Sequence, residues 1–180
     1  MSSLGKDLRK LLSDTQVLDE NEDLMAYAND ATFYLARRSP DAVAIPLSTE
    51  DVSKILKYAF EKRIPVVPRG AGSGLAGGCT PVHGGIVIDM KQMNSIVEIN
   101  RKNMTAEVEG GVVLDRFNRE LRTQKLFYPP DPQSMKVCTI GGNVATRAGG
   151  PRGVKYGTTE RYVTGLEVVL PDGSIITPGG

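Results

Sequence analysis

The sequence predicts an α+β fold of two lobes, in which a β-α-β lobe is followed by a second mixed α/β lobe. Apolar runs at 42–45 and 64–67 are typical of strands, and the segment between them has helical periodicity. Further strand-like runs follow at 86–90, 96–99 and 105–109. We therefore expect an N-terminal helical segment over 1–39, a first lobe over 40–105 and a second lobe over 106–180.

The helix that begins after Ser48 is the clearest element of the first lobe. Ser48 offers an N-terminal cap, and Glu50 and Asp51 place acidic charge in the first turn. The apolar stripe of this helix consists of Val52, Ile55, Leu56, Ala59 and Phe60. A short helix over 3–14 and a helical stretch over 21–35 are expected before it.

The second lobe is expected to begin with a helix over 114–124, because Leu114, Phe117 and Leu121 lie on one face. The stretch FYPPDP that follows is rich in proline and must be extended or turning. Near the C-terminus, Pro171-Asp172-Gly173 is typical of a hairpin that joins strands at 162–170 and 174–177.

The stretch 68–78, PRGAGSGLAGG, is the strongest indication of a binding site. Its glycines leave the backbone almost bare, so that N–H groups can approach an anion closely. Gly72, Gly74 and Gly77 spell G-x-G-x-x-G, but that motif requires a helix after it, and Pro81 with the next strand-like run argues against one. No Lys-Ser or Lys-Thr follows, which excludes a Walker-type loop. We expect the loop to join strand to strand and to bind a phosphate; the alternative is a flexible glycine turn without a ligand.

A second glycine-rich region, GGNVATRAGGPRGVKYG, spans 141–157. Thr139, Asn143 and Thr146 supply short polar groups that can grip a ribityl chain, a pyrophosphate or the edge of a ring. The alternative is a long surface loop. The cations of this region are each more readily interpreted as solvated surface residues than as ligand contacts; they are Arg147, Arg152 and Lys155.

The composition is that of an ordinary globular protein, with 180 residues, 40% hydrophobic content and a net charge of +1. This balance gives no indication of nucleic acid or an anionic membrane as the main partner. There is no apolar run of about 18 residues, and since the N-terminal stretch is polar and charged we expect no signal peptide. Since two cysteines, Cys79 and Cys138, make no disulfide framework, a reducing cytoplasm fits best.

Metal and nucleophile chemistry is weakly supported. His83 is the only histidine, so the chain alone cannot assemble a multi-histidine metal site. Cys79 and His83 lie four positions apart in a loop, and nothing in the pattern orients the histidine as a base. We therefore expect no metal site and assign no catalytic residue to this chain.

Four stretches, in this order, resemble the PCMH-type FAD-binding domain of the vanillyl-alcohol-oxidase superfamily: PRGAGSGLAGG, GGIVIDMKQMNSIVEI, YPPDPQSMKVCTIGGNVATRAGGPRGVKYG and VTGLEVVLPDGSII. The group that contains D-lactate dehydrogenase and the D-type subunit of glycolate oxidase is the most similar, over about 40–178, and DLMAYANDATFY also resembles that group. The resemblance implies FAD bound between two α+β lobes. Some relatives bond the flavin through a histidine in the first glycine loop, which has none here, so non-covalent FAD is expected.

The resemblance also implies which residues contact FAD. Backbone N–H groups at the pyrophosphate come from Arg69, Gly70, Ala71, Gly72, Ser73 and Gly74, and Val82 follows the edge of the cofactor. The residues along the flavin side are Pro130, Asp131, Ser134, Thr139, Gly141, Gly142, Asn143 and Ala145. Those that close over the ring system are Gly149, Gly150, Tyr156 and Gly157.

The reaction that the resemblance implies is oxidation of a 2-hydroxy acid, of the D-lactate or glycolate type, to the 2-oxo acid, with hydride passing to the flavin. The family's substrate arginines, histidine base and metal-binding histidines lie in a C-terminal substrate domain that this sequence lacks. The chain ends at Pro178-Gly179-Gly180, before the usual end of the second lobe. We therefore expect a C-terminally truncated enzyme or one subunit of a split enzyme, inactive alone, with a partner subunit or a second copy as a candidate partner.

Other functions are compatible with parts of this pattern. An ether-lipid synthase or a cell-wall precursor reductase shares the fold, but AGGPRGVKYG is more similar to the hydroxy-acid group. A different class is a flavin-free structural or assembly module without activity of its own, since the chain holds no complete catalytic set.

Overall fold

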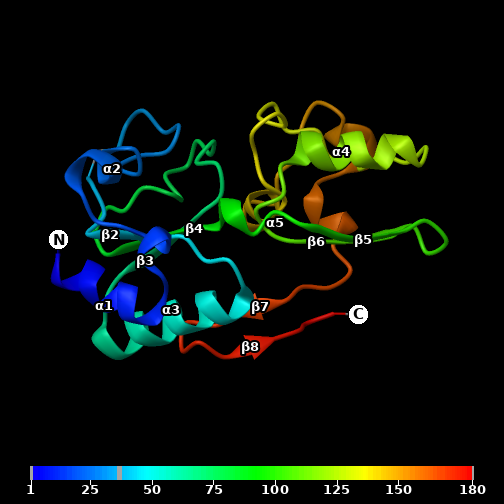
Figure 1. Ribbon diagram of the computed structural model, residues 1–180. Helices are drawn as coiled ribbons and strands as arrows, with labels where there is room; N and C mark the ends of the chain where they lie inside the picture. Colours follow the sequence, from blue (N-terminus) through cyan, green and yellow to red (C-terminus); the bar gives the residue numbers. More distant parts are fainter. Residues whose placement is uncertain (1, 36–37, 180) are drawn as a thin grey trace. The chain divides into compact units, whose positions relative to one another are not determined.

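The computed structural model describes residues 2–35 and 38–179. The described residues form two compact units, one built from the chain up to Gln92 together with the chain from Gly165, and one built from Met93–Thr164. Figure 1 shows the elements of both units. The expected segments 1–39 and 106–180 also contain residues 1, 36, 37 and 180, which lie outside the described residues.

The first unit is built on a four-stranded sheet in the order β1-β2-β4-β3 (Figure 1). β2 (Ala42–Ala44) and β3 (Val66–Arg69) both run parallel to β4 (Ile86–Asp89), which lies between them, and β1 (Val17–Leu18) pairs antiparallel with β2. The helix α3 (Thr49–Lys62) connects β2 to β3. The expected β-α-β unit is therefore confirmed, with a third strand inserted between its two strands.

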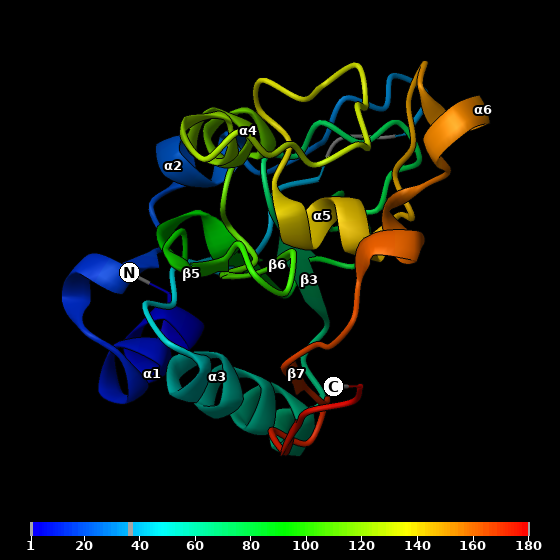
Figure 2. The same cartoon turned by 90° about the vertical axis from the view of Figure 1, so that its right-hand side faces the viewer.

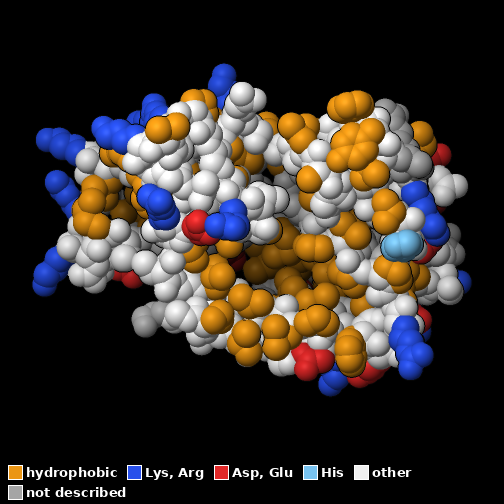
Figure 3. All heavy atoms as spheres, turned by 180° about the vertical axis from the view of Figure 1, so that it is seen from behind, with side chains coloured by type: hydrophobic (Ala, Val, Ile, Leu, Met, Phe, Trp, Pro, Cys, Tyr) orange, Lys and Arg blue, Asp and Glu red, His pale blue; other side chains and the backbone are white. Residues whose placement is uncertain are grey.

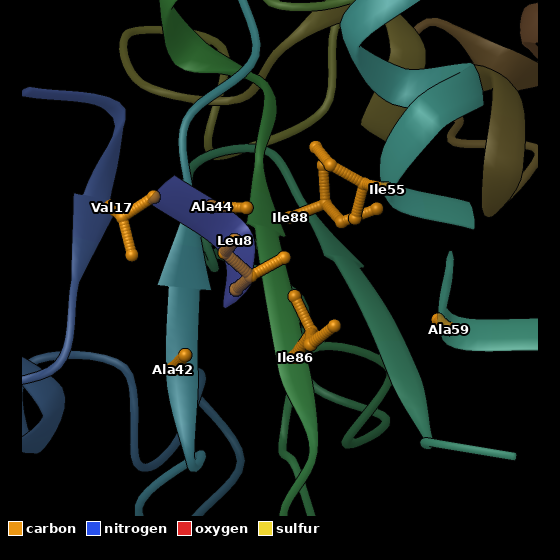
Figure 4. Packing of buried hydrophobic residues seen from close by; sticks show 8 residues of the cluster. All are labelled: Leu8, Val17, Ala42, Ala44, Ile55, Ala59, Ile86 and Ile88. Atoms are coloured by element: carbon orange, nitrogen blue, oxygen red, sulfur yellow. The ribbon is translucent and has the colours of Figure 1, made fainter. Parts of the chain in front are cut away.

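The core of the first unit joins helices and sheet (Figure 4). Ser48 caps α3 by accepting from the Asp51 N–H at 3.2 Å, and Ile55 of this helix is fully buried. It packs in one cluster with Leu8, from α1 (Ser3–Leu11), and with Ile88 of β4. Burial of each such side chain contributes about 1.5–3 kcal/mol, so the strands that flank the glycine loop are held by a firm core.

The loop of 70–85 connects the end of β3 to the start of β4 without a helix. Since these strands are parallel, the chain must travel back along the sheet, and here it does so in turns and extended backbone. This confirms the prediction that the glycine loop joins strand to strand. It also rules out the geometry in which a helix directly follows the glycines of the loop.

Two N-terminal helices are shorter than expected. α1 ends at Leu11, and residues Asp14–Gln16 form the separate 3₁₀ turn η1. α2 spans only Asn21–Met25, whereas the sequence predicted helix as far as residue 35. After Met25 the backbone continues in tighter turns, in which the N–H of Tyr27 donates to the Leu24 carbonyl at 3.0 Å and the N–H of Ala28 to the Met25 carbonyl at 3.3 Å. Further along, Asp30 accepts from the N–H of Thr32 at 2.8 Å, a local bond that competes with helical pairing.

The second unit combines a hairpin with short helices around a core of Val112, Phe117 and Leu121. The sequence predicted strands at 96–99 and 105–109, and the structure pairs them as the antiparallel hairpin of β5 and β6. The elements are β5 (Ile96–Asn100), β6 (Thr105–Val108), α4 (Leu114–Thr123), α5 (Ile140–Ala145), α6 (Gly153–Tyr156) and the 3₁₀ turn η3 (Thr159–Tyr162). The region 141–157, for which a surface loop was one interpretation, thus contains two short helices.

The C-terminal hairpin packs with the first unit, which differs from the lobe expected over 106–180. β7 (Val168–Val169) and β8 (Ile175–Ile176) are antiparallel, and both are shorter than the predicted strands. β7 lies beside α3 in Figures 1 and 2, and Ser53 of α3 donates to the carbonyl of Gly173. A further 3₁₀ turn, η2 (Met90–Gln92), follows β4. Across 2–35 and 38–179, no helix has the length and apolar character needed to cross a membrane.

Candidate functional site

The glycine loop presents unpaired backbone donors. Within the part of the chain that the structure describes, no acceptor is found for the N–H groups from Ala71 to Ala76. This stretch is exposed or half-buried and has no regular secondary structure. Since none of these residues is buried, their N–H groups are open to water or to a ligand, and a run of adjacent donors in a turn is a typical anion-binding concavity. The arrangement fits a phosphate or pyrophosphate held by the main chain.

Arg69 adds a positive charge beneath this loop. Gly72 has φ +66°, and an added Cβ there would collide with the Arg69 guanidinium. The guanidinium is held in place because its Nη1 donates to the carbonyl of Asn29 at 2.9 Å and its Cζ lies 5.5 Å from the ring centre of Tyr27. The sequence assigned only the backbone of Arg69 to the site, whereas the structure also brings its side chain against the loop.

Tyr27 and Thr80 are polar neighbours of the loop that the sequence analysis missed. The Tyr27 hydroxyl donates to Asp89 Oδ2 at 2.8 Å, and burial, followed by this bond, raises the pKa of Tyr27. Thr80 is 4% exposed, and its Oγ1 has no hydrogen-bond partner among the described residues. A buried hydroxyl without a partner is unusual, so Thr80 Oγ1 is a candidate ligand contact. No sequence pattern singles it out.

Residues 79–83 give no indication of an activated nucleophile or of a metal site. Burial raises the pKa of the Cys79 thiol, which therefore holds its proton at neutral pH and is a weak nucleophile. His83 is exposed and visible at the surface in Figure 3. Val82 is 46% exposed, and its carbonyl accepts from Arg38 Nη1 at 3.3 Å. Among the described residues, no group of three or more His, Cys, Asp or Glu side chains could hold a metal ion.

In the second unit, the predicted residues Thr139 to Ala145 fold around the short helix α5. Thr139 is 2% exposed and caps this helix by accepting from the Gly142 N–H at 3.3 Å. An added Cβ on Gly141 would press against the backbone of Gly110, so a larger residue does not fit. Asn143 is 3% exposed, yet its Nδ2 has no partner in the described part of the chain. This buried amide is available to donate to a ligand.

Another set of predicted residues meets around Asp131. Its Oδ2 lies 3.3 Å from Arg152 Nε, and its Oδ1 accepts from the Arg152 N–H at 3.0 Å. The backbone of Gly150 passes so close to the Asp131 carbonyl that no Cβ fits. A pocket of about 370 Å³ lies here, lined by Asn118, Arg122, Phe127, Tyr128, Pro130, Asp131, Met135 and Arg152.

The remaining predicted contacts of the second unit are not among the residues that line this pocket. Neither Thr139 nor Asn143 lines it. Tyr156 is half-buried; its ring packs on Phe127 at 6.0 Å between centroids, and its carbonyl accepts from Tyr162 Oη at 2.7 Å. The other predicted residues of this region are half-buried, and they form no cluster with the side chains that line the pocket; they are Ser134, Gly149 and Gly157.

The backbone donors of the glycine loop with Arg69 against it, in the first unit, and the buried amide of Asn143, in the second unit, are each features that fit a phosphate-bearing cofactor. Comparison with known families identifies the domain: the model of the FAD binding domain matches residues 40–179. The chain belongs to this FAD-binding family. The resemblance drawn from the sequence and the choice of FAD as cofactor are thereby confirmed. The individual FAD contacts stay predictions.

Curated relatives agree with the family. The chain is 49% identical over 162 residues to the glycolate oxidase subunit GlcD of Bacillus subtilis, covering 90% of this chain and 34% of that protein. It is 40% identical over 159 residues to a D-lactate dehydrogenase of Anaerostipes hadrus, covering 88% of this chain and 33% of that protein. The chain therefore spans about a third of the length of these relatives.

Solved structures show the same fold. An alkyldihydroxyacetonephosphate synthase superposes with a TM-score of 0.84 at 25% identity, covering 97% of this chain and 34% of that one. A p-cresol methylhydroxylase with bound substrate superposes with a TM-score of 0.80 at 26% identity, covering 96% of this chain and 34% of that one. The predicted fold class, a PCMH-type α+β FAD-binding domain, is confirmed by these neighbours.

Proposed function

We propose that this chain is the FAD-binding part of a flavin-dependent oxidoreductase that oxidises a 2-hydroxy acid, of the D-lactate or glycolate type, to the 2-oxo acid. The structural observation that supports the FAD-binding part of the proposal is the run of N–H groups from Ala71 to Ala76, which find no acceptor among the described residues. The substrate class is supported by the names of two relatives, a D-lactate dehydrogenase and a subunit of glycolate oxidase.

The loop would hold FAD by its pyrophosphate. Backbone N–H groups of residues 71–76 would donate to the phosphate oxygens, and the Arg69 guanidinium would add positive charge beside them. A hydrogen bond to a charged group contributes roughly 1.5–3 kcal/mol, so three of them offer about 5–9 kcal/mol before the cost of association. Several loop donors acting together are therefore enough to localise a dinucleotide.

In the second unit, Asn143 and its neighbours on α5 are the proposed contacts of the flavin side. The Nδ2 of Asn143 is buried without a partner among the described residues, and a ligand acceptor would satisfy it. The hydroxyl of Thr139 is engaged as the cap of α5, so its part is to position the helix backbone. When bound, FAD supplies the two-electron oxidation that no amino-acid side chain provides.

To test the substrate class, the flavin-loaded protein is isolated from its own cells, together with any chains that copurify. It is then mixed anaerobically with candidate substrates. We expect D-lactate, glycolate or D-2-hydroxyglutarate to bleach the oxidised-flavin absorption band, and a phenol such as p-cresol to leave it unchanged. A flavin that no 2-hydroxy acid reduces contradicts the proposed substrate class. A colourless protein that forms the same oligomer with and without FAD instead supports the flavin-free assembly module.

A further inference from the structure

Two buried polar side chains hold the C-terminal end of the glycine loop. Thr32 is 5% exposed, and its Oγ1 accepts from the N–H of Gly77 at 2.7 Å. Asp30 is also 5% exposed, and its Oδ2 accepts from the N–H of Cys79 at 3.3 Å while its Oδ1 accepts from the N–H of Thr32. Both side chains therefore accept hydrogen bonds from loop N–H groups that closely follow residues 71–76, whose own N–H groups find no acceptor among the described residues.

The same short segment holds the other end of the loop through its backbone. The N–H of Ala31 donates to the carbonyl of Gly72 at 3.1 Å. The carbonyl of Asn29 accepts from Arg69 Nη1 at 2.9 Å. Residues 29–32, which we call the bracing segment, thus contact the loop at both ends and leave residues 73–76 spanning the gap between them.

The charge of Asp30 is explained by this bracing role. Burial opposes ionisation of Asp30, but the hydrogen bonds from Thr32 and from the Cys79 N–H, with the nearby charge of Arg69, lower its pKa. Asp30 is therefore a carboxylate at neutral pH, which can only accept hydrogen bonds. A carboxylate next to an anion-binding loop would repel the ligand if it were exposed. Here the carboxylate is buried and its oxygens accept hydrogen bonds from backbone N–H groups, so it stabilises the shape of the loop and does not face the ligand.

We propose that Asp30 and Thr32 are positioning residues that hold the glycine loop in the shape that binds FAD. The inference rests on the proposed binding of the FAD pyrophosphate by this loop. With both ends fixed, the donors between them need not be ordered when the cofactor arrives, and this preorganisation increases affinity. Without the bracing segment, the loop would have to lose its conformational freedom on binding.

The test measures FAD affinity of the whole chain by quenching of flavin fluorescence, together with its thermal unfolding without FAD. Thr32→Val keeps the shape of the side chain and removes the acceptor, whereas Thr32→Ser keeps the acceptor. We expect Thr32→Val to weaken FAD binding by about tenfold or more and Thr32→Ser to restore most of the affinity. Asp30→Asn, which loses one of two acceptors, should fall between them.

Asp172→Asn is the matched control for the aspartate, because Asp172 Oδ1 also accepts a nearby backbone N–H, from Ser174 at 2.9 Å, but in an exposed turn. It should leave FAD affinity unchanged. Amide hydrogen exchange at Gly77 and Cys79 provides a readout without cofactor, and exchange at these two amides should be faster in Thr32→Val by more than the change in its unfolding temperature accounts for.

The outcomes separate this inference from the proposed function. If the native chain binds FAD and Thr32→Val binds it equally well, or Thr32→Ser loses as much affinity as Thr32→Val, the positioning role is wrong while the cofactor site stands. If the loop amides exchange at the same rate in all variants, the bracing is also refuted. If the native chain binds no FAD, the proposed loop site fails, and the positioning role fails with it.

Discussion

Gly74 offers a way to separate what the cofactor requires of the loop from what the fold requires. Its backbone is not in the left-handed region, and an added Cβ would meet nothing within 4 Å. Gly74→Ala should therefore change the free energy of unfolding of the FAD-free chain by no more than about 0.5 kcal/mol. In the proposed complex, however, the new methyl group occupies the space through which the loop backbone approaches the pyrophosphate.

The expected loss of affinity follows from that geometry. If the methyl group keeps the loop from one charge-assisted hydrogen bond, binding loses about 1.5–3 kcal/mol, which corresponds to roughly a 10- to 100-fold higher Kd. The assay is a titration of the chain with FAD, followed by flavin fluorescence, beside thermal unfolding without FAD.

Gly72→Ala is the matched comparison in the same loop. Gly72 has φ +66°, and its Cβ would strike Arg69, so this variant carries both backbone strain and a side-chain collision. The left-handed conformation alone costs about 1–2 kcal/mol, which lowers Tm by about 2–8 °C in a chain of this size. The reasoning is refuted if Gly74→Ala binds FAD like the native chain, or if it lowers the Tm of the FAD-free chain as much as Gly72→Ala does.

Two further predictions concern buried polar groups away from the glycine loop. Asn143→Leu removes a buried Nδ2 that lacks a partner among the described residues. The free energy of unfolding of the FAD-free chain in urea should therefore rise by about 1 kcal/mol, while FAD binding weakens. A loss of stability would contradict this interpretation. Asp19 pairs with Arg9 at 2.8 Å, and this bond lowers the pKa of Asp19 from 3.8 to about 2. Because the pKa of Asp19 is lower in the folded chain than in the unfolded chain, the pair contributes about 2 kcal/mol to the free energy of unfolding above pH 4, and this contribution is lost as the pH falls toward 2. Urea unfolding at each pH measures the loss. If the free energy of unfolding of Asp19→Asn depends on pH as steeply as that of the native chain, the interpretation is contradicted.

The elements that the sequence predicted well are those whose signals are local. The helix α3 has its cap at Ser48 and an apolar stripe within its own residues, so periodicity and capping were sufficient. The glycine loop was recognised in the same way, because the strand before it and the proline and strand after it are adjacent in sequence. These signals need no knowledge of distant contacts.

The features that the sequence could not predict depend on contacts between distant residues. The helix α5 forms in a glycine-rich stretch of low helix propensity because Thr139 caps it and the Gly110 carbonyl accepts from Gly141 at 2.8 Å. Thr32 was placed in an expected helix, and its bond to Gly77 joins residues 45 positions apart. The Asn29-Asp30 pair is a turn signal, which could have ended the predicted helix earlier but could not have shown which distant residues the turn contacts.

The most direct test of the central claim, that the described residues hold FAD without a covalent bond, is to titrate the chain with FAD and then denature it. We predict a perturbed, resolved flavin absorption band on binding and release of intact FAD from the denatured chain. A flavin spectrum that the chain leaves unchanged, or a flavin that stays attached to the denatured polypeptide, would contradict the account.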